Sequence, residues 1–207
     1  MELIQQLVNG ISLGSIYALI ALGYTMVYGI VRLINFAHGD VFMIGSFVGF
    51  YAVTMLGVGF FPALLLAMAV CAVLGMTIER IAYKPLRNAT RIAVLITAIG
   101  VSLLIEYVMI YLRGAQPEAY PGTLLPKQNL ELFGVVISSQ SLFILGTSLV
   151  LMILLQFIVH RTKIGKAMRA VSHDAEAARL MGINVDNTIS ATFAIGSALA
   201  APASIAI

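Results

Sequence analysis

The chain has 207 residues, of which 60% are hydrophobic and only 10% charged, and its mean hydropathy is +1.00. A soluble domain carries nearer a quarter of charged residues, because its surface faces water. This composition therefore excludes a water-soluble globular domain and indicates a membrane protein. The net charge of +3 does not indicate nucleic-acid binding, because the basic residues lie between apolar runs rather than along one polar face.

Six stretches are long and apolar enough, or nearly so, to form membrane-spanning helices, which need about 20 apolar residues. In chain order they are residues 11–30, 41–55, 61–78, 92–112, 142–159 and 188–207. The second is short, so we expect it to be tilted or partly re-entrant. The sequence predicts an all-α integral membrane protein with about six transmembrane helices in a single domain, residues 1–207. Because the last apolar run has no polar flank, we expect this domain to be incomplete at its C-terminus.

The basic residues predict which connections face the cytoplasm. Four lie in residues 80–91 and five in residues 161–179, which together make nine of the twelve Lys and Arg. The connection at residues 113–140 has only Arg113 and Lys127, offset by Glu118 and Glu131. By the positive-inside rule, the two basic connections face the cytoplasm, and the N-terminus and the 113–140 loop face outward.

A polar interruption, Asn35-Phe-Ala-His-Gly-Asp40, separates the first two apolar stretches. Asn35, His38 and Asp40 offer hydrogen-bonding or titratable groups, and Gly39 permits a bend. One interpretation is a tight loop with a helix-capping Asn or Asp. The other is a broken helix whose backbone lines a water-filled path, because irregular backbone at membrane depth is tolerated only in such places.

The connection at residues 160–187 contains a well-capped short helix. Ser172 or Asp174 can cap its N-terminus, Glu176 lies near its positive end, and Gly182 suits the left-handed position that closes it. The residues predicted to share its apolar face are Ala177, Leu180 and Met181. Such a helix either docks on a partner or rests on lipid headgroups.

Several single residues have a structural and a functional interpretation. Glu106, inside the fourth stretch, either belongs to a transport pathway or pairs with a neighbouring helix. Glu79 and Arg80 are typical of a plain helix end, and Cys71 of a small hydrophobe in a core. The sequence contains no Cys/His cluster that would predict a metal site.

Small residues at helical spacing predict close helix packing. These are Gly10, Gly14 and Ala18, and again Gly45 and Gly49.

Several motifs in a fixed order carry a family resemblance. They are residues 9–24, 26–30, 34–40, 43–46, 78–87, 165–183 and 193–196. With them the sequence resembles the membrane permease of branched-chain amino acid ABC importers, a LivH-type inner-membrane subunit. The likeness covers nearly all of the chain except the outward loop. Family members continue for further helices, so the resemblance also implies a C-terminally truncated chain.

The resemblance implies a multi-pass subunit of the bacterial inner membrane that translocates leucine, isoleucine and valine and is not an enzyme. Its implied partners are a second permease subunit, cytoplasmic ATPase subunits that bind the ATP, and a periplasmic amino-acid-binding protein. No cofactor is expected on this chain itself. The 160–187 loop matches the family's ATPase-coupling loop, which assigns coupling to Ser172, Asp174, Glu176, Ala177, Leu180 and Gly182. The polar interruption matches a break near the translocation path, and with Glu106 the expected pathway set is Asn35, His38, Gly39, Asp40 and Glu106.

Three other interpretations stay open at the level of sequence. A related ABC importer could carry another small solute such as urea, because the polar break does not select the substrate. An ion-coupled secondary transporter would use Asp40 and Glu106 as coupling carboxylates. A purely structural membrane subunit is the third.

Overall fold

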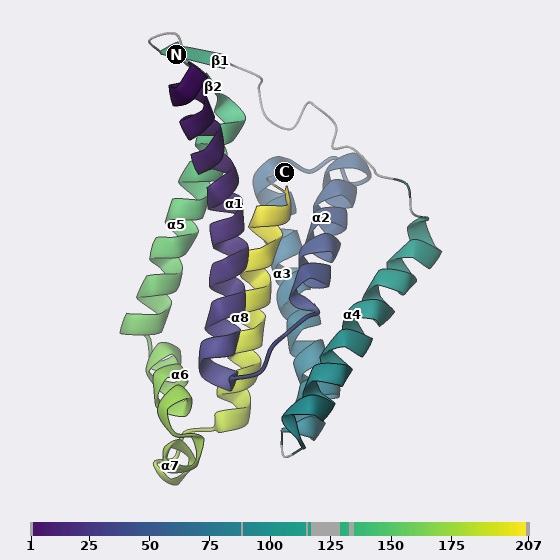
Figure 1. Cartoon of the computed structure of the whole chain (residues 1–207), viewed down its shortest axis with the longest axis vertical. Coiled ribbons are helices and arrows are strands. Elements are labelled where there is room, and N and C mark those ends of the chain that lie inside the picture. Colours follow the sequence, from purple (N-terminus) through teal and green to yellow (C-terminus); the bar gives the residue numbers. More distant parts are fainter. Residues whose placement is uncertain (1, 88, 115, 117–128, 133–134, 206–207) are drawn as a thin grey trace.

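The computed structural model describes residues 2–87, 89–114, 116, 129–132 and 135–205, and nearly all of them are helical (Figure 1). The long helices are α1 (Glu2–Val31), α2 (His38–Thr54), α3 (Phe60–Ile78), α4 (Arg91–Arg113), α5 (Ser139–Arg161) and α8 (Val185–Ile205). The shorter elements are the π-helical turn η1 (Glu79–Tyr83), the 3-10 turn η2 (Lys84–Leu86), α6 (Lys163–His173) and α7 (Ala175–Leu180). The helical membrane class predicted from the sequence is confirmed.

Four of the six predicted spans are long and apolar enough to cross a membrane within the described residues. They are Leu3–Val31, Phe60–Leu86, Ile92–Arg113 and Leu142–Arg161. The other two predicted spans correspond to α2 and α8. Helix α2 has 17 residues, about 25 Å of helix at a rise of about 1.5 Å per residue, which is shorter than a full span. Figure 1 shows α2 beginning above the level at which α4 and α8 begin and ending at the opposite end of the bundle, where α3 starts. Helix α2 is therefore short but does not return to the end from which it starts, as a re-entrant segment would.

Helix α8 lies at the centre of the bundle, against α1, α2 and α3 (Figure 1). Its contacts are close because glycines remove the side chains between the backbones. A Cβ atom on Gly23 of α1 would lie 2.5 Å from the Gly196 carbonyl oxygen, and one on Gly75 of α3 would lie 2.1 Å from the Ser197 Oγ. Cys71 is fully buried beside α2, as expected for a small core residue, and its thiol is 3.5 Å from the Val41 carbonyl oxygen.

The glycine prediction was half right. Gly45 and Gly49 of α2 are buried, as expected of packing residues. Gly10, Gly14 and Ala18 are exposed, and a Cβ atom on either of those two glycines would meet nothing within 4 Å. The α1 face that carries them therefore makes no close helix contact within the described chain, because α8 packs against α1 further along, at Gly23.

Both basic connections lie at the same end of the bundle, as the charge pattern predicts (Figure 1). Helices α6 and α7 occupy that end, together with η1, η2 and the start of α4. Arg32, which follows α1 with a positive φ of 56°, donates a hydrogen bond from Nη2 to the Ser172 carbonyl oxygen at 3.0 Å. This bond joins the end of α1 to the end of α6.

The opposite end holds the N-terminal end of α1 and a two-stranded antiparallel sheet, β1 (Asn129–Leu132) and β2 (Val135–Ser138), in which Leu132 pairs with Val135. These strands were not predicted; Val135, Val136 and Ile137 are β-branched and suit them. Much of the predicted 113–140 loop, including residues 117–128, lies outside the described residues.

Candidate functional site

The polar interruption is a non-helical link that is anchored from two sides. Residues 32–35 leave the helical conformation after α1, and α2 begins at His38. The buried amide of Asn35 accepts a hydrogen bond from the Tyr83 hydroxyl through Oδ1 at 3.0 Å. The Asn35 carbonyl oxygen accepts from the His38 backbone N–H at 3.3 Å. The link therefore joins two helices that run in opposite directions, and Asn35 fixes it to η1 (Figure 1). Neither Asn35 nor Asp40 caps α2, which begins after Ala37 without a side-chain cap.

The predicted pathway residues divide between two sides of α2. Asn35, His38 and Gly39 line a cavity against α1. Asp40 lies on the other side, where its Oδ2 accepts a hydrogen bond from the Ser102 hydroxyl of α4 at 2.5 Å. Glu106 lies one helical turn beyond Ser102 and is exposed. The structure therefore does not bring the five residues together in one site.

Helix α7 has the capping arrangement that the sequence predicts. The Asp174 Oδ1 accepts hydrogen bonds from the backbone N–H groups of Glu176 and Ala177 at 2.9 and 3.0 Å. Gly182 closes the helix with a φ of 83°, and the Ile183 N–H donates to the Ala178 carbonyl oxygen at 3.0 Å. Ser172 is not the cap: it lies inside α6, and its hydroxyl donates to the Arg169 carbonyl oxygen at 2.9 Å.

The apolar side chains of α7 point away from the rest of the molecule. Leu180 and Met181 are 89% and 82% exposed, and Ala177 is also exposed. The inner face is fixed by the buried Ala178, which packs together with Val171 of α6 and Val185 of α8. Helix α7 is thus a short, rigidly capped element with an exposed apolar surface, at the end of the bundle that carries the basic connections (Figure 1).

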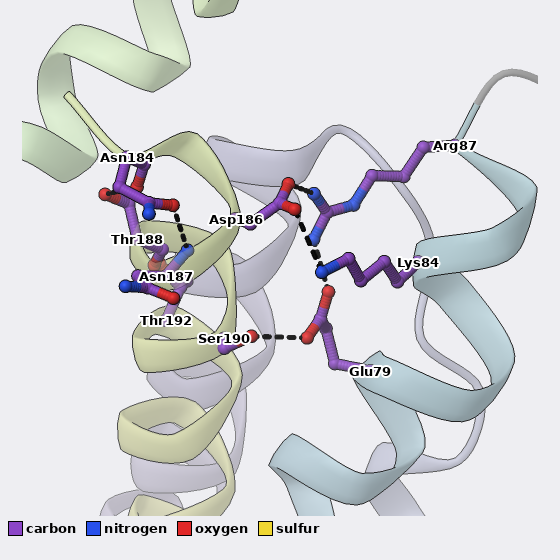
Figure 2. Close-up of polar contacts among 9 residues, drawn as sticks. All are labelled: Glu79, Lys84, Arg87, Asn184, Asp186, Asn187, Thr188, Ser190 and Thr192. Carbon is purple, nitrogen blue, oxygen red and sulfur yellow. Dashed lines mark hydrogen bonds and ion pairs between the residues drawn. The ribbon is translucent and has the colours of Figure 1, made fainter. Parts of the chain in front are cut away.

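A network of charged side chains joins the end of α3 to the start of α8 (Figure 2). Glu79 is fully buried, pairs with Arg87, and accepts a hydrogen bond from the Ser190 hydroxyl at 2.6 Å. Asp186 binds Arg87 Nη1 at 2.5 Å and Lys84 Nζ at 2.9 Å. We call these five residues the Glu79 network. It connects η1 and η2 to the helix that directly follows α7.

The Glu79 network corrects the sequence interpretation of Glu79 and Arg80 as a plain helix end. The helical path continues through η1 and η2 to Leu86, which brings Lys84 and Arg87 beside α8. Asp186 lies in the first turn of α8, ahead of the apolar run that begins at Thr188. The hydrogen bond from Lys84, with the charge of Arg87, holds the pKa of Asp186 below its ordinary value. The sequence offers one signal for such a network, opposite charges on both basic connections, but no indication of their pairing.

No group of three or more His, Cys, Asp or Glu that could hold a metal ion occurs among the residues that the structure describes. The polar groups lie inside or at one end of an apolar helical bundle. This combination is that of a multi-pass membrane protein.

The chain belongs to the family of permease components of branched-chain amino acid transport systems, whose model matches residues 6–207. It is 43% identical to the high-affinity branched-chain amino acid transport system permease protein BraD of Pseudomonas aeruginosa, over 98% of this chain and 69% of that protein. It is 40% identical to the permease protein LivH of Escherichia coli strain K12, over the same shares. A probable LivH of Methanocaldococcus jannaschii is 29% identical, over 90% of this chain and 60% of that protein. No solved structure matches.

Membership of this family makes the chain a membrane-embedded component of a transport system, not an enzyme. It confirms the family resemblance that the motifs carried. The family does not by itself assign roles to individual residues, so the pathway and coupling residues stay predictions.

Proposed function

We propose that this chain is a permease subunit of an ATP-driven importer that moves leucine, isoleucine and valine across the bacterial inner membrane. The substrate follows the printed names of its relatives, which are branched-chain amino acid permeases. A second permease subunit, two ATPase subunits and a periplasmic amino-acid-binding protein complete the importer. ATP is bound on the ATPase subunits, and this chain binds no cofactor.

The observation that carries the ATP-driven mechanism is the exposed apolar face of α7. Leu180 and Met181 project from a helix that is capped by Asp174 and closed at Gly182, outside the membrane-spanning segments. Exposed apolar side chains on a rigid helix suit a groove on a partner protein. In this proposal α7 docks on an ATPase subunit, and Ser172, Asp174, Glu176, Ala177, Leu180 and Gly182 form or shape the docking loop.

Movement of α7 would reach the membrane helices through two connections. Arg32 ties α6 to the end of α1, directly before the polar interruption. The Glu79 network ties the start of α8 to the end of α3. ATP-driven movement of the ATPases would thus shift α1, α3 and α8 together and change the access of the polar interruption to either side.

Uptake of radiolabelled leucine in cells that express the complete importer tests this proposal. We expect uptake that requires the ATPase subunits, and a loss of at least about tenfold on Leu180→Asp or on deletion of residues 175–180. Arg161→Gln, at the exposed end of α5 and in none of the predicted sites, is the control for substitution of a charged residue away from α7. ATPase-dependent uptake of urea instead of leucine would contradict the substrate. Leucine uptake without the ATPases would contradict the coupling role and favour an ion-coupled transporter.

A further inference from the structure

Helix α6 packs against the last turn of α5. A Cβ atom on Gly165 would collide with the carbonyl oxygens of Ile158 and Val159, so only glycine permits this close approach. The Arg169 guanidinium donates a hydrogen bond to the Val159 carbonyl oxygen. Because the apolar span of α5 ends at Arg161, the first turns of α6 lie at the level of the membrane surface.

Helix α6 has a buried side and an exposed basic side. Met168 and Val171 are buried, and the helix contacts α1, α5 and α8. The opposite side carries Lys163 and Lys166, which are both exposed. We call these two lysines the α6 basic face. A helix with one apolar side and one basic side, lying at the level of the headgroups, is typical of segments that bind the membrane surface.

The α6 basic face has no counter-charge. Helix α6 contains no Asp or Glu, and neither lysine makes an ion pair or a hydrogen bond among the residues that the structure describes. In the other basic connection, by contrast, Lys84 and Arg87 pair with Asp186. Residues three apart are neighbours on a helix surface, so Lys163 and Lys166 form one patch that an anion would neutralise.

The start of α6 adds to this attraction. The Thr162 hydroxyl caps the helix by accepting a hydrogen bond from the Gly165 N–H at 3.1 Å. The first turn of a helix carries a partial positive charge, and Lys163 lies in that turn. The groups that attract an anion are therefore concentrated where α6 adjoins α5.

We propose that the α6 basic face binds the phosphate headgroup of an anionic phospholipid in the adjoining leaflet. The acyl chains of this lipid lie along α5, where Leu154 and Phe157 are 49% and 59% exposed. The site is one for a lipid of the surrounding membrane, not for the transported solute, so the inference goes beyond the proposed function.

The continuity of the apolar surface favours a lipid over an acidic protein surface. Phe157 within the span of α5 and Ile164 at the start of α6 are both exposed, on either side of the membrane boundary. A phospholipid covers such side chains with its acyl chains and the lysines with its headgroup, whereas an acidic protein surface would match the lysines alone. Helix α7, the proposed dock for an ATPase, lies beyond α6 and further from the membrane helices (Figure 1).

Tryptophan fluorescence can report which lipid lies beside α5, because the chain contains no tryptophan and bromine atoms on lipid chains quench this fluorescence on contact. The variant Phe157→Trp places the fluorophore next to α6. Leu104→Trp, at a position 63% exposed in the middle of α4, samples the lipid away from α6. Both variants are placed in nanodiscs of phosphatidylglycerol and phosphatidylcholine in equal amounts, with one lipid brominated at a time.

We expect phosphatidylglycerol to bind at least about threefold more strongly than phosphatidylcholine beside position 157, because each lysine near the headgroups contributes up to about fivefold. The two lipids should quench Leu104→Trp equally. Equal quenching of Phe157→Trp by the two lipids would overturn the proposal.

The part played by the lysines is tested by Lys163→Gln with Lys166→Gln in the Phe157→Trp background. Both side chains are exposed, so we expect the fold to be kept and the preference for phosphatidylglycerol to disappear. Lys163→Arg with Lys166→Arg keeps the charge and should keep the preference. The matched control is Arg179→Gln, at an exposed residue of α7, which should also keep it. A preference that survives neutralisation of both lysines would overturn the proposal.

Salt provides a second measurement on the same protein. Raising the ionic strength from about 0.1 to about 1 M shortens the Debye length from about 10 to about 3 Å. We therefore expect the preference for phosphatidylglycerol to fall, and an unchanged preference would contradict binding by charge.

A protein partner is the competing explanation for the α6 basic face. In that case Lys163→Gln with Lys166→Gln would lower the amount of ATPase subunit that copurifies with the complete importer, and Phe157→Trp would show no lipid preference. This pair of results would replace the lipid by a protein. Unchanged copurification together with a lost lipid preference would support the lipid site, whether or not the importer carries leucine.

Discussion

At the scale of single residues, Glu79 differs most from what the sequence pattern predicts. Glu79 follows directly after an apolar helix, where a carboxylate is expected to face water. In the structure it is fully buried, and Arg87 and Ser190 satisfy its oxygens. A buried carboxylate is tolerated only with such partners, because loss of its hydration must be offset. Arg87 and Ser190 therefore offset the cost of burying Glu79.

Glu79→Ala is predicted to destabilise the protein by about 3–5 kcal/mol, because it leaves the largely buried Arg87 without its buried partner. Asp186→Ala should cost less than about 1 kcal/mol, because Asp186 is 40% exposed and its ion pairs are screened by water. Unfolding in mixed micelles with increasing SDS, followed by circular dichroism, measures both values. Equal stability of the two variants would show that burial of Glu79 contributes little.

At the scale of elements, the bundle is held by a few close helix crossings around α8. In a membrane, helices associate through tight packing and not through exclusion of water, so small residues at the crossings matter most. Gly23 with Gly196, and Gly75 with Ser197, are such crossings. The exposed Gly10 and Gly14 have the same sequence spacing but no neighbour within 4 Å. Spacing identifies candidate packing faces, whereas the choice among them depends on which helix lies opposite.

Gly75→Ala is predicted to destabilise the protein by about 1–3 kcal/mol, because its Cβ atom would lie 2.1 Å from the Ser197 Oγ and force α3 away from α8. The second variant, Gly75→Ala with Ser197→Gly, should regain part of this loss, since it removes the nearest atoms. Gly100→Ala on α4 is the matched control, because nothing lies within 4 Å of its new Cβ atom. The same SDS titration measures all three variants. A Gly75→Ala protein as stable as Gly100→Ala would contradict the packing described here.

At the scale of the whole molecule, both basic connections and α7 lie at one end of the bundle, and the N-terminal end of α1 lies at the other. The positive-inside rule assigns the basic end to the cytoplasm. Cys71, the single cysteine of the chain, is fully buried beside α2 and provides an unreactive background for labelling.

We expect a membrane-impermeant maleimide to leave the unmodified protein unlabelled in intact cells and in inverted membrane vesicles. With Cys71→Ala, the variant Leu180→Cys should label only in inverted vesicles, because the positive-inside rule places α7 on the cytoplasmic side. Leu3→Cys, at the exposed start of α1, should label only in intact cells opened at the outer membrane. The reverse pattern would invert the orientation of the bundle.

Local features of the sequence were sufficient for the elements and for the caps of α7. Apolar runs predict where helices form, because the bilayer requires every backbone group to be paired within the chain. Asp174 and Gly182 act within a few residues of their own positions, so their roles follow from local backbone geometry. The positive-inside rule places each basic connection on the cytoplasmic side by its own charge. It therefore predicts that both connections lie at the same end of the bundle.

Only the tertiary structure decided which distant residues meet. Glu79 and Ser190 are 111 positions apart, and their pairing depends on η1 continuing α3 and on α8 lying beside it. The expected pathway residues are close in sequence, yet Asp40 faces α4 while His38 faces α1, because residues two apart in a helix point to nearly opposite sides. Pairings of this kind depend on the relative placement of whole helices, which the sequence of each helix alone does not specify.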